Sequence, residues 1–176
     1  ENSMAQQMNL FIRPAMASDA PEIHHIVQLA FAEYASLLGL GQPPKALLET
    51  ADDILRDMHD KRVLIGFINM TKAIGSVRYD VQDGIAYISR FAILPNWQQS
   101  GMGRALLSQV ESECRQQGVQ ALALHTGTKL MAQARFYYAN GFYVHSTSQD
   151  HGYIRGLFVK ELHPDRPIDL SGVINR

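Results

Sequence analysis

The sequence predicts an α/β domain in which a mixed sheet of six or seven strands is flanked by helices. Three observations predict this fold class. Apolar runs of strand length alternate with stretches of helical periodicity. Strands in series precede a β-α-β-α-β-β order, which is typical of a sheet with helices on both faces. The 176 residues include 46% hydrophobic and 19% charged residues, as expected for one globular domain with a sizeable core.

The first third of the chain contains a short strand and two helices. Residues 9–13 form the strand candidate. Asp19 and Glu22 have the spacing of a capping box, which predicts the start of a first helix. Glycines and prolines at positions 39–44 interrupt the chain, and apolar residues then recur at helical spacing over residues 47–58. We therefore expect one amphipathic helix over that second stretch.

Three strands follow, and the third leads into a glycine-containing loop. Residues 62–69 and 74–82 are apolar strands, and Asp83-Gly84 predicts a hairpin turn into a long strand over residues 85–94. After the loop, helical periodicity covers residues 101–117.

The last part of the chain continues the alternation of strands and helices. A strand is expected over residues 119–126, a helix over 130–139, and an antiparallel pair over 142–148 and 153–162. Since no repeat or linker interrupts this order, we expect a single domain over residues 9–163. Residues 1–8 would lie outside the fold, and residues 164–176 would form a C-terminal tail.

Charge and cysteine content exclude several classes of protein. The net charge of −1 favours neither nucleic acid nor an anionic membrane as the main partner. No apolar run approaches the ~20 residues of a membrane span, and no signal peptide is visible, so a cytoplasmic protein is expected. The seven histidines show no metal-binding spacing, and the single cysteine, Cys114, is expected to be structural.

The loop before the third helix predicts a binding site for an anion. A helix N-terminus presents unpaired amides and a partial positive charge, and Gly101 and Gly103 allow a phosphate to approach the backbone. A nucleotide P-loop would need Lys and then Ser or Thr after the last glycine, where this chain has Arg104 and Ala105. A dinucleotide-binding loop would need a third glycine, where this chain has Leu106.

A third interpretation matches the loop better. The segment Gln98-Gln99-Ser100-Gly101-Met102-Gly103 fits Q/R-x-x-G-x-G/A and resembles the pyrophosphate loop of the GNAT superfamily of acyl-CoA N-acyltransferases. The approach to the loop, the segment from Phe136 to Phe142, and Ile12-Arg13-Pro14-Ala15 followed by Asp19 also resemble that family. The resemblance therefore covers about Leu10 to Leu162, and its motifs agree with the element order.

This resemblance implies a GNAT-like fold that binds acetyl-CoA and transfers its acetyl group directly to a primary amine in a ternary complex. The strands before and after the glycine-loop helix would splay apart to admit the pantetheine arm, an example of ligand β-augmentation. Backbone groups of two residues on the earlier strand would pair with that arm, and loop amides would hold the pyrophosphate. The implied cofactor-binding residues are Phe91, Ile93, Gln98, Gln99, Ser100, Gly101, Met102, Gly103 and Arg104.

Two side chains are candidate catalytic residues. By resemblance, Tyr137 lies where the family places a tyrosine that protonates the departing sulfur, with Tyr138 as the alternative and aromatic core packing as the non-catalytic interpretation. His125, at the end of the strand that borders the gap, is the candidate general base because its pKa range suits proton transfer at neutral pH. Glu33, Tyr34 or a chain of water molecules are the alternatives.

One departure from the family pattern leaves a second function open. Members often carry an Asn seven residues before the tyrosine, whereas this chain has Leu130. A non-catalytic acyl-CoA-binding module is therefore the alternative function, and a longer acyl donor is a third. The expected partner is a small-molecule or peptide amine, with a homodimer as the assembly to test.

Overall fold

The computed structural model describes residues 9–176, and its central element is a seven-stranded mixed sheet in the order β1-β2-β3-β4-β5-β7-β6. The expected extension at residues 1–8 lies outside the described residues. The strands are β1 Leu10–Pro14, β2 Arg62–Ile68, β3 Lys72–Gln82, β4 Ile85–Ile93, β5 Ala121–Gly127, β6 Tyr143–Ser148 and β7 Arg155–Glu161. The α-helices are α1 Ala20–Leu38, α2 Lys45–Leu48, α3 Ala51–Asp60, α4 Met102–Gln116 and α5 Met131–Ala139. The predicted fold class is confirmed.

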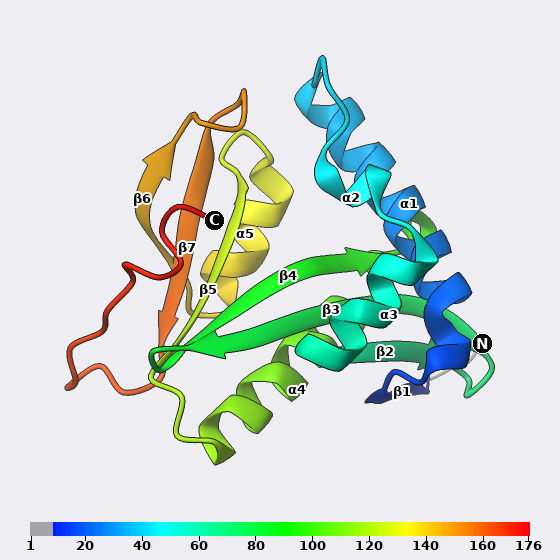
Figure 1. The fold of residues 1–176 in the computed structure, drawn as a ribbon, viewed down its shortest axis with the longest axis horizontal. Coiled ribbons are helices and arrows are strands. Elements are labelled where there is room, and N and C mark those ends of the chain that lie inside the picture. The colour runs from blue at the N-terminus through cyan, green and yellow to red at the C-terminus, as the bar shows by residue number, and fades with distance from the viewer. Residues whose placement is uncertain (1–8) are drawn as a thin grey trace, which may run out of the picture.

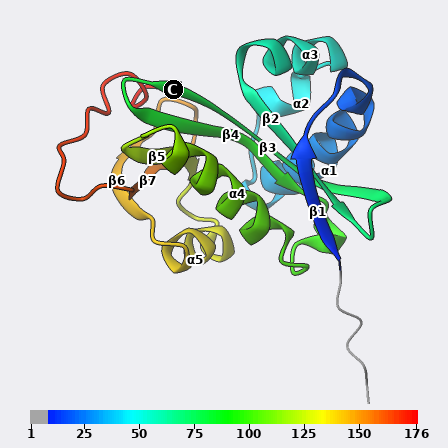
Figure 2. The same ribbon diagram turned by 90° about the horizontal axis from the view of Figure 1, so that it is seen from below.

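Helices cover both faces of the sheet, with α1 to α3 on one side and α4 and α5 on the other (Figures 1 and 2). The main core lies between these layers and includes Ile26, Ile65, Leu106 and Phe158, each at most 1% exposed. Of the helices within residues 9–176, none combines the length and apolar content needed to cross a bilayer.

Strands β4 and β5 separate partway along their length. They pair in parallel only from Ile85 to Tyr87, opposite 121–123, and beyond this point they diverge (Figure 1). Strand β5 continues instead as the antiparallel partner of β7, while β4 remains paired with β3. The edge of β4 from Ile88 to Ile93 that faces β5 therefore has no strand partner, as the predicted splay requires.

A β-bulge shapes β4 inside this opening. The register with β3 shifts between Ser76 and Arg78, and Arg90 adopts a φ of 48°, in the left-handed region that non-glycine residues seldom occupy. Bulges bend a strand and redirect its side chains, and they are common beside functional sites. Arg90 in this bulge lies beside Glu49, which is between α2 and α3.

The prediction of one helix over residues 47–58 is wrong, because two helices, α2 and α3, cover this stretch. Thr50 caps the start of α3: its Oγ1 accepts a hydrogen bond from the amide of Asp53 at 3.2 Å, and its own amide donates to the Asp53 carboxylate at 2.8 Å. This capping box starts a new helix at Ala51. Glu49 consequently has extended backbone (ψ 137°) between α2 and α3.

The capping box expected at Asp19 does not form with the amides of α1. The Asp19 carboxylate instead accepts hydrogen bonds from the amide of Met16 at 2.7 Å and from the Arg13 guanidinium at 2.6 and 3.0 Å. The hydrogen bonds from Arg13 are the main reason that the pKa of Asp19 is lowered. The residue therefore joins β1 to the start of α1.

The segment expected as a C-terminal tail packs on the sheet. Leu170 and Val173 are 7% and 1% exposed and belong to a second apolar cluster with residues of β4, β5 and β7. Arg176 pairs with Asp80 on β3 at 2.8 and 2.9 Å, and its guanidinium carbon lies 4.7 Å from the centroid of the Tyr87 ring. This segment therefore contributes to the wall of the cavity described below.

Candidate functional site

The loop between β4 and α4 presents a run of unpaired backbone amides. Gly101 adopts a φ of 87° immediately before α4, a conformation that favours glycine. The amide of Met102 donates to the Ser100 Oγ at 3.2 Å. In this loop, five amides have no acceptor among residues 9–176, namely those of Gln98, Gln99, Gly101, Gly103 and Arg104. Because the positive end of the helix dipole lies at the same place, this loop can bind an anion.

The position of α4 against the sheet depends on two glycines in the neighbouring strands. Met102 is fully buried and packs over β2 and β3, where Gly66 and Gly75 have no side chains. A Cβ added to Gly75 would lie 2.9 Å from the Met102 Cγ, closer than packed carbon atoms approach. The side chain of Met102 is therefore a core contact, and only backbone groups at this position can reach a ligand.

One cavity of about 1290 Å³ connects the loop with the opening between β4 and β5. Predicted site residues that line it are Phe91, Ile93, Gln98, Gln99, Gly103, His125 and Tyr137. Those that do not line it are Ser100, Gly101, Met102 and Arg104. The structure thus brings the candidate catalytic residues and part of the loop to one cavity, although they are up to 39 positions apart in the sequence.

Tyr137 lies in the cavity wall and is packed among aromatic rings. The ring centroids of Phe136, Phe142 and Phe158 are 5.4, 5.6 and 5.5 Å from its own. Burial raises the pKa of Tyr137, so its hydroxyl stays protonated at neutral pH. No residue among 9–176 makes a hydrogen bond with that hydroxyl, whereas Tyr138 is 54% exposed and outside the cavity wall. Of the two tyrosines, Tyr137 is the one that a bound substrate can meet.

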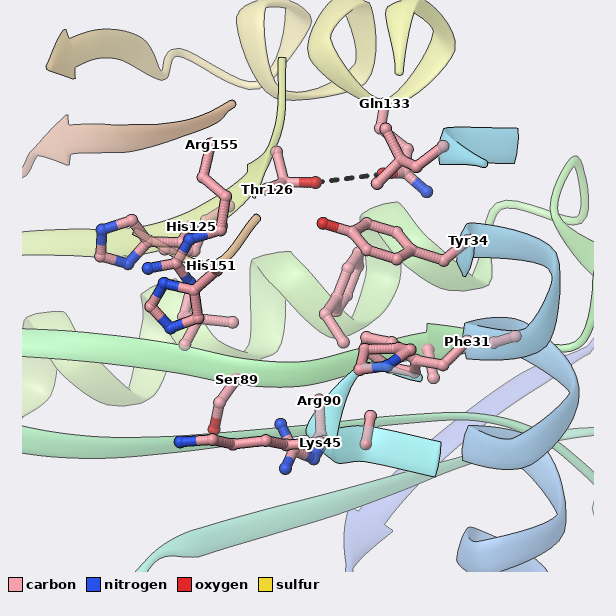
Figure 3. Close-up of a pocket in the computed structure, with 18 of the residues that line it drawn as sticks. Phe31, Tyr34, Lys45, Ser89, Arg90, His125, Thr126, Gln133, His151 and Arg155 are labelled. Carbon is pink, nitrogen blue, oxygen red and sulfur yellow. Dashed lines mark hydrogen bonds between the residues drawn. The ribbon is translucent and has the colours of Figure 1, made fainter. Parts of the chain in front are cut away.

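His125 lies on the cavity wall where β5 leaves β4 (Figure 3). Its Nδ1 is 2.7 Å from the Tyr87 hydroxyl. Burial, and then the positive charge of Arg155, lower the pKa of His125 to about 4. The imidazole is therefore neutral at pH 7 and able to accept a proton, but it is a weaker base than an ordinary histidine.

This pKa shift predicts a pH-dependent stability. An unfolded histidine takes up a proton near pH 6.5 while folded His125 does not do so until about pH 4, so the free energy of unfolding should fall as the pH is lowered between these values. Urea unfolding at pH 7, 6 and 5 measures this decline. His125→Gln should show a shallower decline, and an unchanged decline in that variant would contradict the shift.

A pair of tyrosine hydroxyls closes one end of the cavity. The Tyr34 hydroxyl accepts a hydrogen bond from the amide of Gly127 at 3.1 Å and lies 2.9 Å from the Tyr153 hydroxyl. Burial raises the pKa of Tyr34, so this group is protonated at neutral pH and unsuited to the base role that we weighed for it. Glu33, the other alternative, does not line the cavity.

Position 130 lacks the amide side chain of the family pattern, but a neighbouring residue supplies one. Leu130 is 7% exposed and precedes α5. Gln133, four residues before Tyr137 and so on the same helical face, lines the cavity and accepts a hydrogen bond from the Thr126 Oγ1 at 3.2 Å (Figure 3). Helical spacing from Tyr137 would have identified Gln133, which our sequence analysis missed.

A buried charge network supports the opposite wall. Arg78 is 0% exposed and donates hydrogen bonds to both carboxylate oxygens of Glu49 and, at 2.8 Å, to Asp57. The Nε of Arg90 lies 3.4 Å from the same Glu49 carboxylate. Arg90 thus lines the cavity with its guanidinium beside Glu49.

Comparison with known proteins agrees with this geometry. The family model described as the acetyltransferase (GNAT) family matches residues 23–142. An IAA acetyltransferase from Azospirillum brasilense is 31% identical over 68 residues, which are 39% of this chain and 44% of that relative. The match therefore spans less than half of the relative's length.

Solved structures share the fold. The PaiA N-acetyltransferase of Thermoplasma acidophilum, solved in complex with coenzyme A, has a TM-score of 0.77 at 18% identity and covers 88% of this chain and 99% of its own. The ribosomal-protein-S18-alanine N-acetyltransferase of Escherichia coli has a TM-score of 0.70 at 19% identity, covering 88% and 95%. Since the family model covers well over half of the chain, and the strand splay and the amide loop agree with it, this chain belongs to the acetyltransferase (GNAT) family.

Proposed function

We propose that the chain is an acetyl-CoA-dependent N-acetyltransferase that moves an acetyl group directly to a primary amine of a small molecule or peptide. The observation that carries the proposal is the continuity of one cavity from the unpaired loop amides, along the free edge of β4, to Tyr137. Membership of the acetyltransferase family supports the same activity.

The residues present fit coenzyme A. The amides from Gln98 to Arg104 offer several donors to a diphosphate, and a Cβ at Gly103 would lie 3.5 Å from the Phe136 ring, within the space the ligand would use. Backbone groups of β4 between Ile88 and Ile93 lack a strand partner and can pair with the amide groups of pantetheine. Acetyl-CoA, when bound, supplies an activated acyl group and a thiolate leaving group.

The side chains of the cavity can move the two protons that this transfer requires. An alkylamine has a pKa of about 10.4, so reaching its neutral form at pH 7 costs about 4–5 kcal/mol. His125, neutral at pH 7, accepts a proton from the amine side, directly or through water. Tyr137 donates its hydroxyl proton toward the departing sulfur, as our sequence analysis expects.

A thiol-release assay with acetyl-CoA and a panel of amines tests this function. Release of free thiol that depends on the amine supports acetyl transfer. Binding of coenzyme A without turnover across the panel would favour the non-catalytic acyl-CoA-binding module instead. Faster release from longer acyl-CoA donors would shift the proposal to a different acyl group.

The phosphate-binding role of the loop predicts a specific loss of affinity. Gly103→Glu adds a side chain beside Phe91 and Phe136 and a negative charge beside the amides. Coenzyme A should therefore bind at least about tenfold more weakly, which corresponds to a loss of about 1.4 kcal/mol in binding free energy. Isothermal titration calorimetry measures this loss. Ser108→Glu is the matched control, since Ser108 is exposed on the same helix and outside the cavity. Equal affinities for the two variants would contradict the loop assignment.

Compartment and assembly remain part of the proposal. We expect a cytoplasmic protein, which fractionation of the host cell tests. Light scattering on the purified protein, with and without coenzyme A, tests the expected homodimer.

A further inference from the structure

Arg155 is a buried cation without a counter-ion among residues 9–176. It begins β7, where its backbone pairs with Gly127 of β5 and Ser148 of β6. The residue is 7% exposed and lines the cavity. Its Nε and Nη2 are inaccessible to solvent, and neither has a hydrogen-bond partner among residues 9–176. Burying a guanidinium without hydrogen-bond acceptors is energetically unfavourable. The residues around Arg155 therefore indicate which acceptor it pairs with.

The carboxylates near Arg155 already have partners. Asp80, the one carboxylate among the described residues lining the cavity, accepts hydrogen bonds from Arg176 at 2.8 and 2.9 Å. Behind the wall, Glu49 binds Arg78. Asp150, which does not line the cavity, lies 3.1 Å from His151. Among residues 9–176, no carboxylate therefore pairs with Arg155.

Positive charge dominates this part of the cavity. Cationic side chains in its lining are Lys45, Lys61, Arg90, Arg155 and Arg176. Figure 3 shows Arg155 beside His125 and His151, with Arg90 and Lys45 across the cavity. A polyamine would meet this wall with like charges and an already paired Asp80, so the electrostatics disfavour a polycationic acceptor.

Arg155 is also separate from the coenzyme A loop. Alternation along β5 and β7 places Arg155 and His125 on the same face of the sheet, the face on which Leu170 and Val173 pack. The helix α4, which carries the loop amides, packs on the opposite face. Arg155 therefore faces the compartment left for the acceptor and not the diphosphate.

We propose that Arg155 binds a carboxylate of the acceptor, and that the acceptor is a small molecule carrying both a primary amine and a carboxylate. The inference rests on the proposed function. The guanidinium fork matches the two oxygens of a carboxylate, and such charge-assisted pairs are among the stronger hydrogen bonds in proteins. Binding the carboxylate at Arg155 leaves the amine of the acceptor free to reach the acyl group, with His125 beside it.

Kinetics with matched acceptors test the proposal. Each standard amino acid is compared with its own carboxamide in the thiol-release assay, so that the amine is kept and the carboxylate is neutralised. For at least one pair, the acid should have kcat/KM about tenfold or more above that of the amide. Amides used as well as their acids, or turnover only with amines that lack a carboxylate, would overturn the proposal.

Variants of Arg155 test whether this residue causes the preference for acids over amides. Arg155→Gln should raise KM for the acid about tenfold or more and bring the ratio of kcat/KM for the acid to that for its amide close to one, while the affinity for coenzyme A stays within about twofold. The ratio cancels any change that the lost charge causes at His125, because both acceptors use the same base. Arg135→Gln removes an exposed arginine of α5 outside the cavity and should change none of these quantities. An Arg155→Gln enzyme that keeps the full preference for the acid would overturn the proposal.

Thermal unfolding distinguishes a binding role from a structural role. Arg155→Met replaces an uncompensated buried charge with an apolar chain of similar length, so the melting temperature of the variant should be unchanged or higher. A markedly lower melting temperature would assign Arg155 to the fold and overturn the proposal. Calorimetry with coenzyme A distinguishes failure of this inference from failure of the proposed function. If coenzyme A does not bind, both are overturned. If coenzyme A binds but the enzyme shows no preference for acids, the inference alone is overturned.

Discussion

Tyr137→Phe is expected to lower kcat for acetyl transfer by about 10²–10⁴-fold, the usual contribution of a general acid. The substitution removes one oxygen from a ring that packs against Phe136, Phe142 and Phe158, so the aromatic core should be retained. No residue in the described chain makes a hydrogen bond with that hydroxyl, so its loss leaves no buried partner unsatisfied. The thiol-release assay at saturating acetyl-CoA measures the change in kcat.

Tyr138→Phe is the matched control for this experiment. Its side chain is 54% exposed and outside the cavity, so kcat should stay within about twofold of the wild-type value. Coenzyme A affinity should be equal in both variants, because the phosphate-binding amides lie on another element. A fall of less than about tenfold for Tyr137→Phe would show that this residue is not the acid.

The second large expected effect concerns stability. Arg78→Met should lower the free energy of unfolding by about 3–5 kcal/mol, because Glu49 would remain buried without its main partner. Attraction to Glu49 and Asp57 outweighs burial, which by itself lowers the pKa of Arg78, so the pKa is raised and the residue stays charged throughout the accessible pH range. Urea unfolding at pH 7 measures the change.

Arg56→Met serves as its control. Arg56 pairs with Asp53 on the surface, where its side chain is 68% exposed, and such pairs contribute about 0–1 kcal/mol. Similar losses in the two variants would show that the buried network does not hold α2 and α3 against the sheet. Because Glu49 also positions Arg90 in the cavity wall, Arg78→Met should in addition raise KM for the amine.

Local patterns were sufficient to predict most of the fold. The alternation of apolar runs predicted all seven strands to within two residues at each end, and Asp83-Gly84 located the hairpin between β3 and β4. The boundary between α2 and α3 was missed, although Thr50 and Asp53 have the spacing of a capping box. Continuous helical periodicity across residues 47–58 concealed it, because the spacing of apolar residues does not reveal that Glu49 and Thr50 have extended backbone.

The loop before α4 was predictable because its conformation depends on local sequence. Two glycines before a helical pattern determine where amides are left unpaired, and this depends only on nearby residues. The burial of Met102 was not predictable, since it depends on Gly66 and Gly75 of strands that are distant in the sequence.

The sequence by itself determined the family, the order of the elements and the position of the cofactor loop, because these follow from backbone conformations that neighbouring residues impose. Only the tertiary structure decided which tyrosine lies in the cavity, that residues 164–176 pack on the sheet, and that Arg155 is buried without a counter-ion in the described part of the chain. These properties depend on the burial and charge that distant segments create when they meet across the sheet. The acceptor specificity that we infer rests on those contacts and not on any motif.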